Sequence, residues 1–341
     1  MKDNSIRRLI EAQARLEQIL DNFLNQPILV VGDLTLDEFL TGQVERISRE
    51  APVLILRHEQ TRQIPGGGAN AVYNLAKLGA QVKVVGIVGD DIQGEALLDI
   101  FNQVGIDTTL VLKTKERPTV TKTRIAGHAR QSVTQQIVRV DRKSDALPSL
   151  EIQNQLASLI QEKATTVKAI VCSDYGDGVF TSPVIKACLA HDRVIVDTQK
   201  DLARYRGATL FTPNLPEAEQ AVGYPINDFN SLQQAGKDLL NLTQASQMLI
   251  TRGEEGMSLF EGTTTEEIMA FNRTDVFDVT GAGDTVVAAL TLALVAGASF
   301  WEAAVLGNLA ASLVVRQFGT ATTTITEMKE ALAKLITKYS E

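Results

Sequence analysis

The most constraining stretch of this chain is a glycine-rich turn that leads directly into an apolar segment. Residues 278–284 read DVTGAGD, and residues 285–294 read TVVAALTLAL. The apolar run predicts a buried helix, and a glycine turn at its start leaves several backbone N–H groups unpaired at the positive end of the helix dipole. Such a helix start is predicted to bind an anion.

Asp284 stands in the first turn of this predicted helix, beside the anion site. A carboxylate is repelled by a phosphate, which favours a chemical role, in which Asp284 accepts the proton of a hydroxyl group that attacks the phosphate. The alternative is that Asp284 only caps the helix, as Asp commonly does. The turn alone leaves both interpretations open.

Two motifs of the chain resemble the signatures of one enzyme family. DVTGAGD resembles the C-terminal signature of the ribokinase (PfkB) carbohydrate kinases, in which the last Asp is the general base and Gly-Ala-Gly is the anion hole. The stretch PGGGANAVYNLAKLG at residues 65–79 is similar to the N-terminal signature, although Val72 stands where the family often has Ala. The resemblance implies a catalytic group of Asp284, Gly281, Ala282 and Gly283, and a sugar-binding group of Gly67, Gly68 and Asn70.

The resemblance also implies that ATP and Mg²⁺ are bound. TPNLPE at residues 212–217 resembles the family's Asn-x-x-Glu element, in which the two side chains, here Asn214 and Glu217, organise Mg²⁺ and its waters. An amide and a carboxylate suit a hard ion that keeps most of its water. The same spacing is a helix cap with a capping-box Glu, and both interpretations can hold together. The further nucleotide contacts implied are Thr251, Gly253, Gly256 and Asn308, with a possible K⁺ site at Asp278 and Thr280 near the turn at residues 318–320.

The apolar run PILVVGD at residues 27–33 predicts a central parallel strand that carries Asp33 to the carboxyl edge of a sheet. Ligands of open α/β sheets bind at that edge. In the kinases that the chain resembles, an Asp at this point hydrogen-bonds sugar hydroxyls, so Asp33 is expected to bind the acceptor. A turn Asp is the alternative.

Apolar strands alternate with amphipathic helices after residue 80, which predicts an α/β fold with a doubly wound, mostly parallel sheet flanked by helices. Two segments, about 36–59 and 117–141, alternate polar and apolar residues and predict a small antiparallel lid inserted in a domain over residues 27–330. In the family such a lid covers the sugar and often forms the dimer contact, which implies a homodimer. Residues 1–26 are expected to form a helical extension, with an apolar stripe over residues 4–24, and residues 331–341 the end of a C-terminal helix.

Composition excludes several other classes of protein. Lys plus Arg number 33 against 41 Asp plus Glu, and the resulting net charge of −8 argues against a nucleic-acid surface. The longest apolar run is too short to span a bilayer. The N-terminal residues resemble neither a signal peptide nor a transit peptide, so a cytoplasmic location is expected. Two cysteines and three scattered histidines predict neither a disulfide scaffold nor a histidine-built metal centre.

Within the family the resemblance is strongest to the D-glycero-β-D-manno-heptose-7-phosphate kinases, the kinase half of ADP-heptose synthase. The stretches that carry it lie at residues 31–34, 46–53, 205–215 and 318–322. They imply phosphorylation of O1 of the heptose 7-phosphate to give the 1,7-bisphosphate, with Arg46, Lys122, Arg124 or Arg139 meeting the acceptor phosphate. No nucleotidyltransferase domain is expected after residue 330.

Three departures from that branch affect the lid and the cleft, where substrate choice is set. Arg49 replaces a usual proline, residues 127–135 form a longer lid turn, and Asp197-Thr198 replaces Asp-Pro. Another PfkB-type sugar or nucleoside kinase, or a catalytically silent ligand-binding relative, therefore remains an alternative. An NAD-dependent dehydrogenase is disfavoured, because the first strand is followed by GDLT and not by Gly-x-Gly-x-x-Gly.

Overall fold

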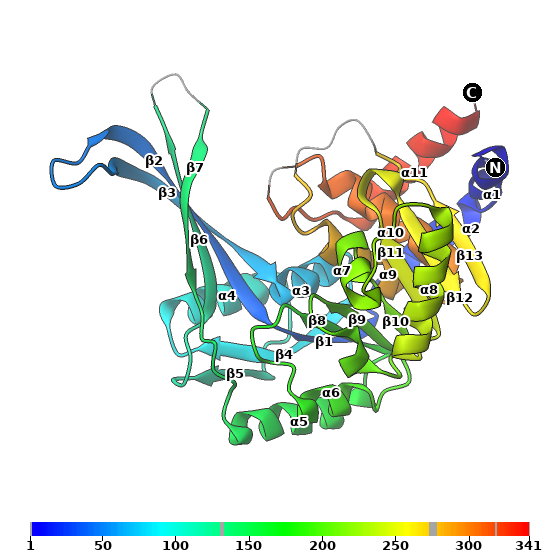
Figure 1. Cartoon of the computed structure of the whole chain (residues 1–341), viewed down its shortest axis with the longest axis horizontal. Coiled ribbons are helices and arrows are strands. Elements are labelled where there is room, and N and C mark those ends of the chain that lie inside the picture. Colours follow the sequence, from blue (N-terminus) through cyan, green and yellow to red (C-terminus); the bar gives the residue numbers. More distant parts are fainter. Residues whose placement is uncertain (1, 130–132, 273–277, 318, 341) are drawn as a thin grey trace.

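The computed structural model describes residues 2–129, 133–272, 278–317 and 319–340. Its main feature is a nine-stranded sheet of order β13-β12-β11-β10-β9-β8-β1-β4-β5 (Figure 1). The strands are β1 (Pro27–Gly32), β4 (Gln81–Gly89), β5 (Val111–Thr114), β8 (Ala169–Asp174), β9 (Val194–Thr198), β10 (Leu210–Phe211), β11 (Gln247–Thr251), β12 (Met257–Glu261) and β13 (Thr264–Ile268). All neighbouring pairs from β11 to β5 are parallel. The two remaining pairs, β11 with β12 and β12 with β13, are antiparallel. The predicted mostly parallel sheet is confirmed.

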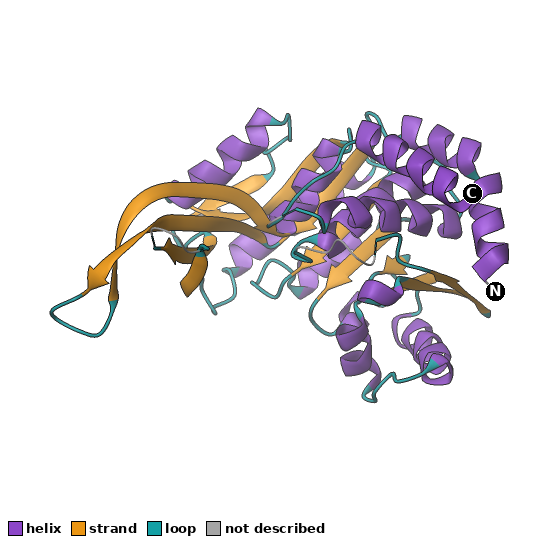
Figure 2. Cartoon of the chain, turned by 90° about the horizontal axis from the view of Figure 1, so that it is seen from above, coloured by secondary structure: helices purple, strands orange, loops and turns teal. Residues whose placement is uncertain are grey.

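Helices cover both faces of this sheet (Figure 2). One face carries α1 (Lys2–Glu11), α2 (Gln13–Asp21), α3 (Gly68–Lys77), α4 (Ile92–Gln103), α9 (Ala282–Val295), α10 (Phe300–Val314) and α11 (Ile325–Ser340). The other face carries α5 (Leu150–Ala164), α6 (Ser182–Cys188), α7 (Leu215–Val222) and α8 (Phe229–Thr243). Strand β1 explains this layering: Ile28 and Val30 point into the first core, and Leu29 and Val31 into the second.

The lid is a four-stranded sheet of order β3-β2-β6-β7 that extends away from the main body (Figure 1). Its strands are β2 (Leu34–Ile47), β3 (Leu54–Gly67), β6 (Val120–His128) and β7 (Gln135–Arg142). Each hairpin is antiparallel as predicted, and the two hairpins meet through a parallel pairing of β2 with β6. The first hairpin also runs beyond the expected limit at residue 59, because β3 continues to Gly67 and leads directly into α3. The longer turn expected at residues 127–135 lies partly outside the described residues.

The N-terminal extension consists of two helices with a break at Ala12, where the sequence predicts one continuous stripe. Leu16, Ile19, Leu20 and Phe23 are fully buried against the body. The Asp21 carboxylate pairs with Lys329 Nζ of α11 at 2.5 Å, and the two chain termini lie near each other (Figure 2). Within the described ranges, no helix has the length and apolar character needed to cross a bilayer.

Candidate active site

A polar cavity of about 240 Å³ lies where the carboxyl ends of β8, β9 and β11 meet the start of α9. This is the edge at which open α/β sheets bind ligands. Four carboxylates border the cavity, namely those of Asp174, Asp197, Glu217 and Asp284. Its remaining lining is Tyr175, Gln199, Thr212, Asn214, Thr251, Val279, Gly281 and Gly283.

Asp284 stands in the first turn of α9 with only 3% of its surface exposed. Asn70 Nδ2 donates a hydrogen bond to Asp284 Oδ2 at 2.7 Å, and the Tyr175 hydroxyl donates to Oδ1 at 3.1 Å. Burial raises the pKa of Asp284 to about 6, although these two donors lower it. A carboxylate with this pKa is largely ionised at neutral pH and is a better proton acceptor than an ordinary Asp.

A chain of buried amides holds the Asn70 donor in place. Asn74 Nδ2 donates to the Asn70 backbone carbonyl at 2.9 Å and to Asn70 Oδ1 at 3.1 Å. The Thr285 hydroxyl in turn donates to Asn74 Oδ1 at 2.9 Å. Because Asn70 and Asn74 belong to α3 and Thr285 follows Asp284 in α9, this chain fixes one helix against the other. Asn74 was not predicted as a site residue. Its position one helical turn after Asn70, on the same face of the helix, could have indicated it.

The glycine turn before α9 gives backbone groups access to the cavity. Gly281 has a φ of 77°, and a Cβ atom at this position would lie 2.6 Å from Asn70 Nδ2, so only glycine fits. Gly281 and Gly283 line the cavity, and the N–H of Gly283 has no acceptor within the helix because it belongs to the first turn. The Ala282 N–H instead turns back to the Val279 carbonyl at 3.2 Å. Of the three residues expected to form the anion hole, the two glycines border the polar cavity.

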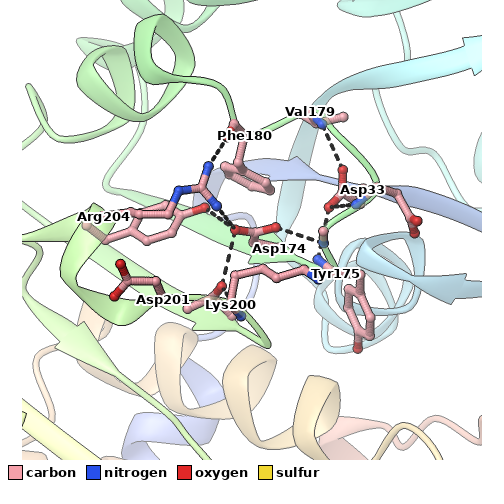
Figure 3. A network of polar contacts seen from close by, with 12 residues as sticks. Asp33, Asp174, Tyr175, Val179, Phe180, Lys200, Asp201 and Arg204 are labelled. Atoms are coloured by element: carbon pink, nitrogen blue, oxygen red, sulfur yellow. Dashed lines mark hydrogen bonds and ion pairs between the residues drawn. The ribbon is translucent and has the colours of Figure 1, made fainter. Parts of the chain in front are cut away.

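Asp33 is 1% exposed, and its carboxylate is engaged by the loop that follows β8 (Figure 3). Oδ2 accepts the N–H groups of Tyr175 at 2.9 Å and Asp177 at 3.0 Å, and Oδ1 accepts that of Val179 at 3.0 Å. Burial raises the pKa of Asp33 to about 7, against the lowering effect of the backbone donors. The side chain therefore holds the loop that carries Tyr175 to Asp284 and does not border the polar cavity.

Gly67 and Gly68 also pack against the strand end that carries Asp33. The Gly68 N–H donates to the Asp33 carbonyl at 2.9 Å, and a Cβ atom on Gly68 would lie 2.9 Å from the Asp33 nitrogen. Gly67 has a φ of 51°, and a Cβ atom there would lie 2.8 Å from Thr35 Oγ1. The missing side chains thus let the start of α3 approach residues 33–35, which brings Asn70 to Asp284.

Asp174 ties the ends of two strands to the following 3-10 turn (Leu202–Tyr205) (Figure 3). Its Oδ2 accepts hydrogen bonds from the Tyr205 hydroxyl at 2.7 Å and the Thr198 hydroxyl at 3.2 Å, and pairs with Arg204 Nη1 at 3.3 Å. The other oxygen accepts the Gly176 N–H at 2.9 Å. The Lys200 side chain lies directly over Gly176, where any Cβ atom would collide with it. These contacts stabilise the rim of the polar cavity.

Asn214 and Glu217 form a reciprocal cap at the start of α7 and also line the cavity. Asn214 Oδ1 accepts the Glu217 N–H at 2.9 Å, and Glu217 Oε2 accepts the Asn214 N–H at 2.9 Å. Burial, followed by the charges of Asp284 and Glu217, raises the pKa of Asp197 well above its ordinary value. A nearby cation would relieve this repulsion. The amide of Asn214 and the carboxylate of Glu217 are oxygen donors of the kind that suit a hydrated Mg²⁺.

A second cavity of about 730 Å³ adjoins the first, and both are lined by Asn214, Thr251, Val279 and Gly283. Its walls include Gly253, Gly256 and Asn308, together with the apolar side chains of Met257, Val286, Ala311 and Val315. Asn308 Nδ2 donates to the Met269 carbonyl at 2.7 Å and so holds one wall of the cavity. A mainly apolar cavity of this size with a few polar groups suits a ligand of nucleotide size.

The two residues expected at a K⁺ site lie in the turn before α9. Asp278 Oδ1 accepts the Thr280 N–H at 2.9 Å, and Asp278 Oδ2 accepts the Gly319 N–H at 3.0 Å. The amide donors lower the pKa of Asp278, although burial opposes them. Phe318, also expected near this site, lies outside the described residues.

The structure adds Asp37 of the lid to the surroundings of the base, next to Lys122 and Arg124, which the sequence had already named as candidate cations. The Asp37 carboxylate is 4% exposed, pairs with Arg124 Nη1 at 2.8 Å and occupies the space left by the missing side chain of Gly66. The Asp37 charge raises the pKa of Asp284 and the Lys122 charge lowers it, which places both near the base. Asp37 directly follows the segment Leu34-Thr35-Leu36 near the start of β2. The sequence analysis did not name this carboxylate as a site residue, although it lies close to the predicted strand end at Asp33.

Comparisons with known proteins show the family and the fold of this chain. The model of the family described as pfkB family carbohydrate kinase matches residues 26–327. Two curated relatives named bifunctional protein HldE are each 42% identical to this chain, one from Pelobacter propionicus over 93% of the chain and one from Trichlorobacter lovleyi over 89%. The chain covers 65% and 62% of their lengths, which is less than two thirds of each.

Solved structures share the fold at low sequence identity. A ribokinase from Arabidopsis thaliana complexed with ribose and ATP matches with a TM-score of 0.69 and 22% identity. Phosphofructokinase-2 from Escherichia coli in complex with potassium matches with a TM-score of 0.73 and 20% identity. Each match covers 92% of this chain and 99% of the other chain. These likenesses establish a ribokinase-like fold.

The hydroxyl of Tyr175 is predicted to control the pKa of Asp284. Tyr175→Phe removes a donor that stabilises the ionised carboxylate, so the pKa of Asp284 should rise above about 6. A ¹³C NMR titration of Asp-labelled protein, with the resonance assigned through Asp284→Asn, measures this shift. The matched control is Tyr205→Phe, because the Tyr205 hydroxyl donates to Asp174 and does not contact Asp284. An unchanged Asp284 pKa in Tyr175→Phe would contradict the assignment.

Proposed function

The chain belongs to the pfkB family of carbohydrate kinases, and we propose that it transfers the γ-phosphoryl group of ATP to O1 of D-glycero-β-D-manno-heptose 7-phosphate. The observation that carries the proposal is the position of Asp284. Its buried carboxylate lines the carboxylate-lined cavity beside the Gly281–Gly283 turn, and the neighbouring Gly283 borders both this cavity and the larger, mainly apolar one. A proton acceptor next to backbone amides at a helix start is the arrangement that phosphoryl transfer to a hydroxyl requires.

In the proposed reaction the acceptor oxygen forms a bond to the γ-phosphorus while the bond from that phosphorus to the bridging oxygen of ADP breaks. Asp284 takes the proton of the attacking hydroxyl. The N–H groups of Gly281 and Gly283 stabilise the charge on the transferring group, together with the dipole of α9. Asn70 and Tyr175 orient the base through their hydrogen bonds to its two oxygens. Asp33, through the loop at residues 175–179, acts as a positioning residue.

The larger cavity is proposed to hold the nucleotide, with the base against the apolar wall near Asn308 and the phosphates toward Asn214. Hydrated Mg²⁺ near Asn214 and Glu217 would neutralise the phosphate oxygens. The reciprocal cap at the start of α7 would hold the Asn214 and Glu217 side chains in place for this role. K⁺ at Asp278 and Thr280 belongs to the same proposal, supported by a carboxylate of lowered pKa in the turn before the anion hole.

The acceptor is proposed to lie between Asp284 and the lid. Lys122 and Arg124 are two residues apart in β6, so they lie on the same face of the strand, roughly 7 Å from each other. Two cations at this spacing suit a sugar whose phosphate is distant from its reacting hydroxyl. Asp37, held by Arg124, is the carboxylate proposed to accept sugar hydroxyls. Arg46 is less suited because it lies near the far end of the β2–β3 hairpin. Arg139 of β7 lies opposite Arg124 in the β6–β7 pairing and pairs with Asp141 at 2.8 Å.

The acceptor is tested by measuring ATP consumption over a panel of heptose 7-phosphate, free heptose, hexose phosphates and nucleosides. The proposal predicts a kcat/KM for heptose 7-phosphate at least about tenfold above those of free heptose and the nucleosides, because they lack the phosphate and one lost charged contact costs on the order of 1.4 kcal/mol or more. The hexose phosphates, which keep the phosphate, should also react more slowly than heptose 7-phosphate. A preference for another sugar or a nucleoside would favour the alternative kinase. ATP binding without transfer to any acceptor would favour a catalytically silent relative.

Asp284→Asn is predicted to lower kcat by roughly 10² to 10⁴ through loss of the proton acceptor. The fold should be retained, because Asn has the same shape and the buried charge is removed. Steady-state kinetics with the best acceptor, beside an unfolding curve, measure both effects. Asp90→Asn, an exposed carboxylate paired with Lys115, is the control and should leave kcat unchanged. Turnover of Asp284→Asn within a few-fold of the parent would refute the base assignment.

A homodimer through the lid is proposed because the lid exposes apolar side chains. Val138 and Val140 of β7 are 45% and 52% exposed, and Ile47, Val53, Leu54, Val133 and Ile137 of the lid are also exposed. Val138→Glu with Val140→Glu should convert a dimer to a monomer in sedimentation velocity, since charges in an apolar interface are costly. The control, Ile92→Glu with Leu150→Glu, changes two apolar residues outside the lid that are even more exposed than Val138 and Val140. A parent protein that sediments as a monomer would contradict the proposal.

A further inference from the structure

A thin wall separates the N-terminal helix from the larger cavity. Ile268, Met269 and Phe271 face a small space of about 30 Å³ whose opposite side is formed by Ile6 and Leu9 of α1. Ala270 and Asn272 of the same segment line the larger cavity on its other side. The residues after β13 therefore face α1 across this small space on one side and line the proposed nucleotide site on the other.

Arg8 joins α1 to the two elements that build this wall. Its guanidinium group lies 3.9 Å from the centroid of the Trp301 ring in α10, and it also pairs with the carboxylate of Glu266 in β13. Trp301 is 9% exposed, so the cation stacks on a largely buried ring. The side chain thus bridges α10 and β13 at the back of the wall.

Glu267, the residue after Glu266 in β13, connects this strand to a residue that lines the larger cavity. Side chains of consecutive strand residues point to opposite faces, so Glu266 and Glu267 project in opposite directions. Glu267 pairs at 2.5 Å with Arg252 Nη1, which also donates to the Ser258 hydroxyl at 2.9 Å. Arg252 lines the larger cavity. β13 is therefore held by one ion pair to Arg8 of α1 and by another to Arg252, which lines the larger cavity.

α10 is fixed to the same segment inside the cavity. Asn308, seven residues and about two turns after Trp301, donates its amide to the Met269 carbonyl at 2.7 Å and lines the cavity. α10 and residues 266–269 are therefore joined at two points. Arg8 bridges Trp301 and Glu266 at one point, and Asn308 bonds to Met269 at the other.

We infer that α1 is a structural part of the nucleotide site and that Arg8 is a positioning residue for ATP. The helix does not contact the ligand. By holding β13 against α10 it keeps Met269, Ala270 and Asn308 in the positions that shape the cavity. The inference rests on the proposed function for its ligand, ATP, and extends it by assigning a role to residues 1–26.

The test compares Arg8→Ala with Arg7→Ala in the full chain. Arg7 is the neighbouring arginine, is exposed and pairs at 3.0 Å with Glu11 of its own helix. Isothermal titration calorimetry with Mg²⁺ and a non-hydrolysable ATP analogue gives Kd, and steady-state kinetics give kcat and both KM values. Arg8→Ala should raise Kd and the KM for ATP roughly three- to ten-fold, the range expected for loss of a partly buried cation–π contact. The KM for the acceptor and kcat should stay within about two-fold, and Arg7→Ala should match the parent.

Three results would overturn the inference. They are an unchanged Kd in Arg8→Ala, an equal rise in Arg7→Ala, and equal rises in the KM values of ATP and acceptor. A lowered unfolding midpoint with unchanged Kd would show a role in stability alone. If Arg8→Ala does not fold, Glu266→Gln removes the ion pair and leaves Arg8 on Trp301, and a smaller rise in Kd is expected. Absence of ATP binding by the parent protein would refute the proposed function itself, whereas parent binding with an unchanged variant refutes only the role of Arg8.

Discussion

The arrangement of this site depends on keeping one carboxylate ionised in a buried position. Removing Asp284 from water disfavours its charged form, and burial is the largest influence on its pKa. The charge is retained because Asn70 and Tyr175 each donate a hydrogen bond to it. These donors come from α3 and from the loop after β8, which are more than 100 residues apart in sequence. The sheet, the close approach of Gly68 to Asp33 and the buried Asn70–Asn74–Thr285 chain all serve to bring these donors together.

The sequence predicted the parts of the site that depend on local structure. The glycine turn at residues 281–283, the cap at Asn214 and Glu217, and the residues Thr251, Gly253, Gly256 and Asn308 all line one pair of adjoining cavities. The mostly parallel sheet was confirmed because strands such as β1 are apolar on both faces. The glycine turn and the helix cap are local patterns of the sequence. Thr251, Gly253, Gly256 and Asn308 were expected because the chain resembles the PfkB kinases, and their role in nucleotide binding stays a prediction.

The partners of the strand-end carboxylates could not be predicted, because they come from distant segments. Asp33 was expected to bind the acceptor, yet its oxygens accept amides from residues 175, 177 and 179, which only the pairing of β1 with β8 brings close. Asp37 was not singled out, since its proximity to Asp284 follows from the direct continuation of β1 into β2 and from the missing side chain at Gly66. The parallel pairing of β2 with β6 is likewise invisible in hairpin patterns. It is what places Lys122 and Arg124 beside Asp37.

The charge balance of the cavity bears on the proposed binding of a nucleotide together with a metal ion. Asp174, Asp197, Glu217 and Asp284 already repel one another, as the raised pKa of Asp197 indicates. A nucleotide triphosphate would add several negative charges to the same space, and the nearby amides of the α9 turn supply only partial positive charge. A divalent cation offsets this repulsion where neither Lys122 nor Arg204 can, because Lys122 lies over the Tyr175 ring and Arg204 is committed to Asp174. A chain of net charge −8 would therefore need a divalent cation in this cavity to hold a polyphosphate there.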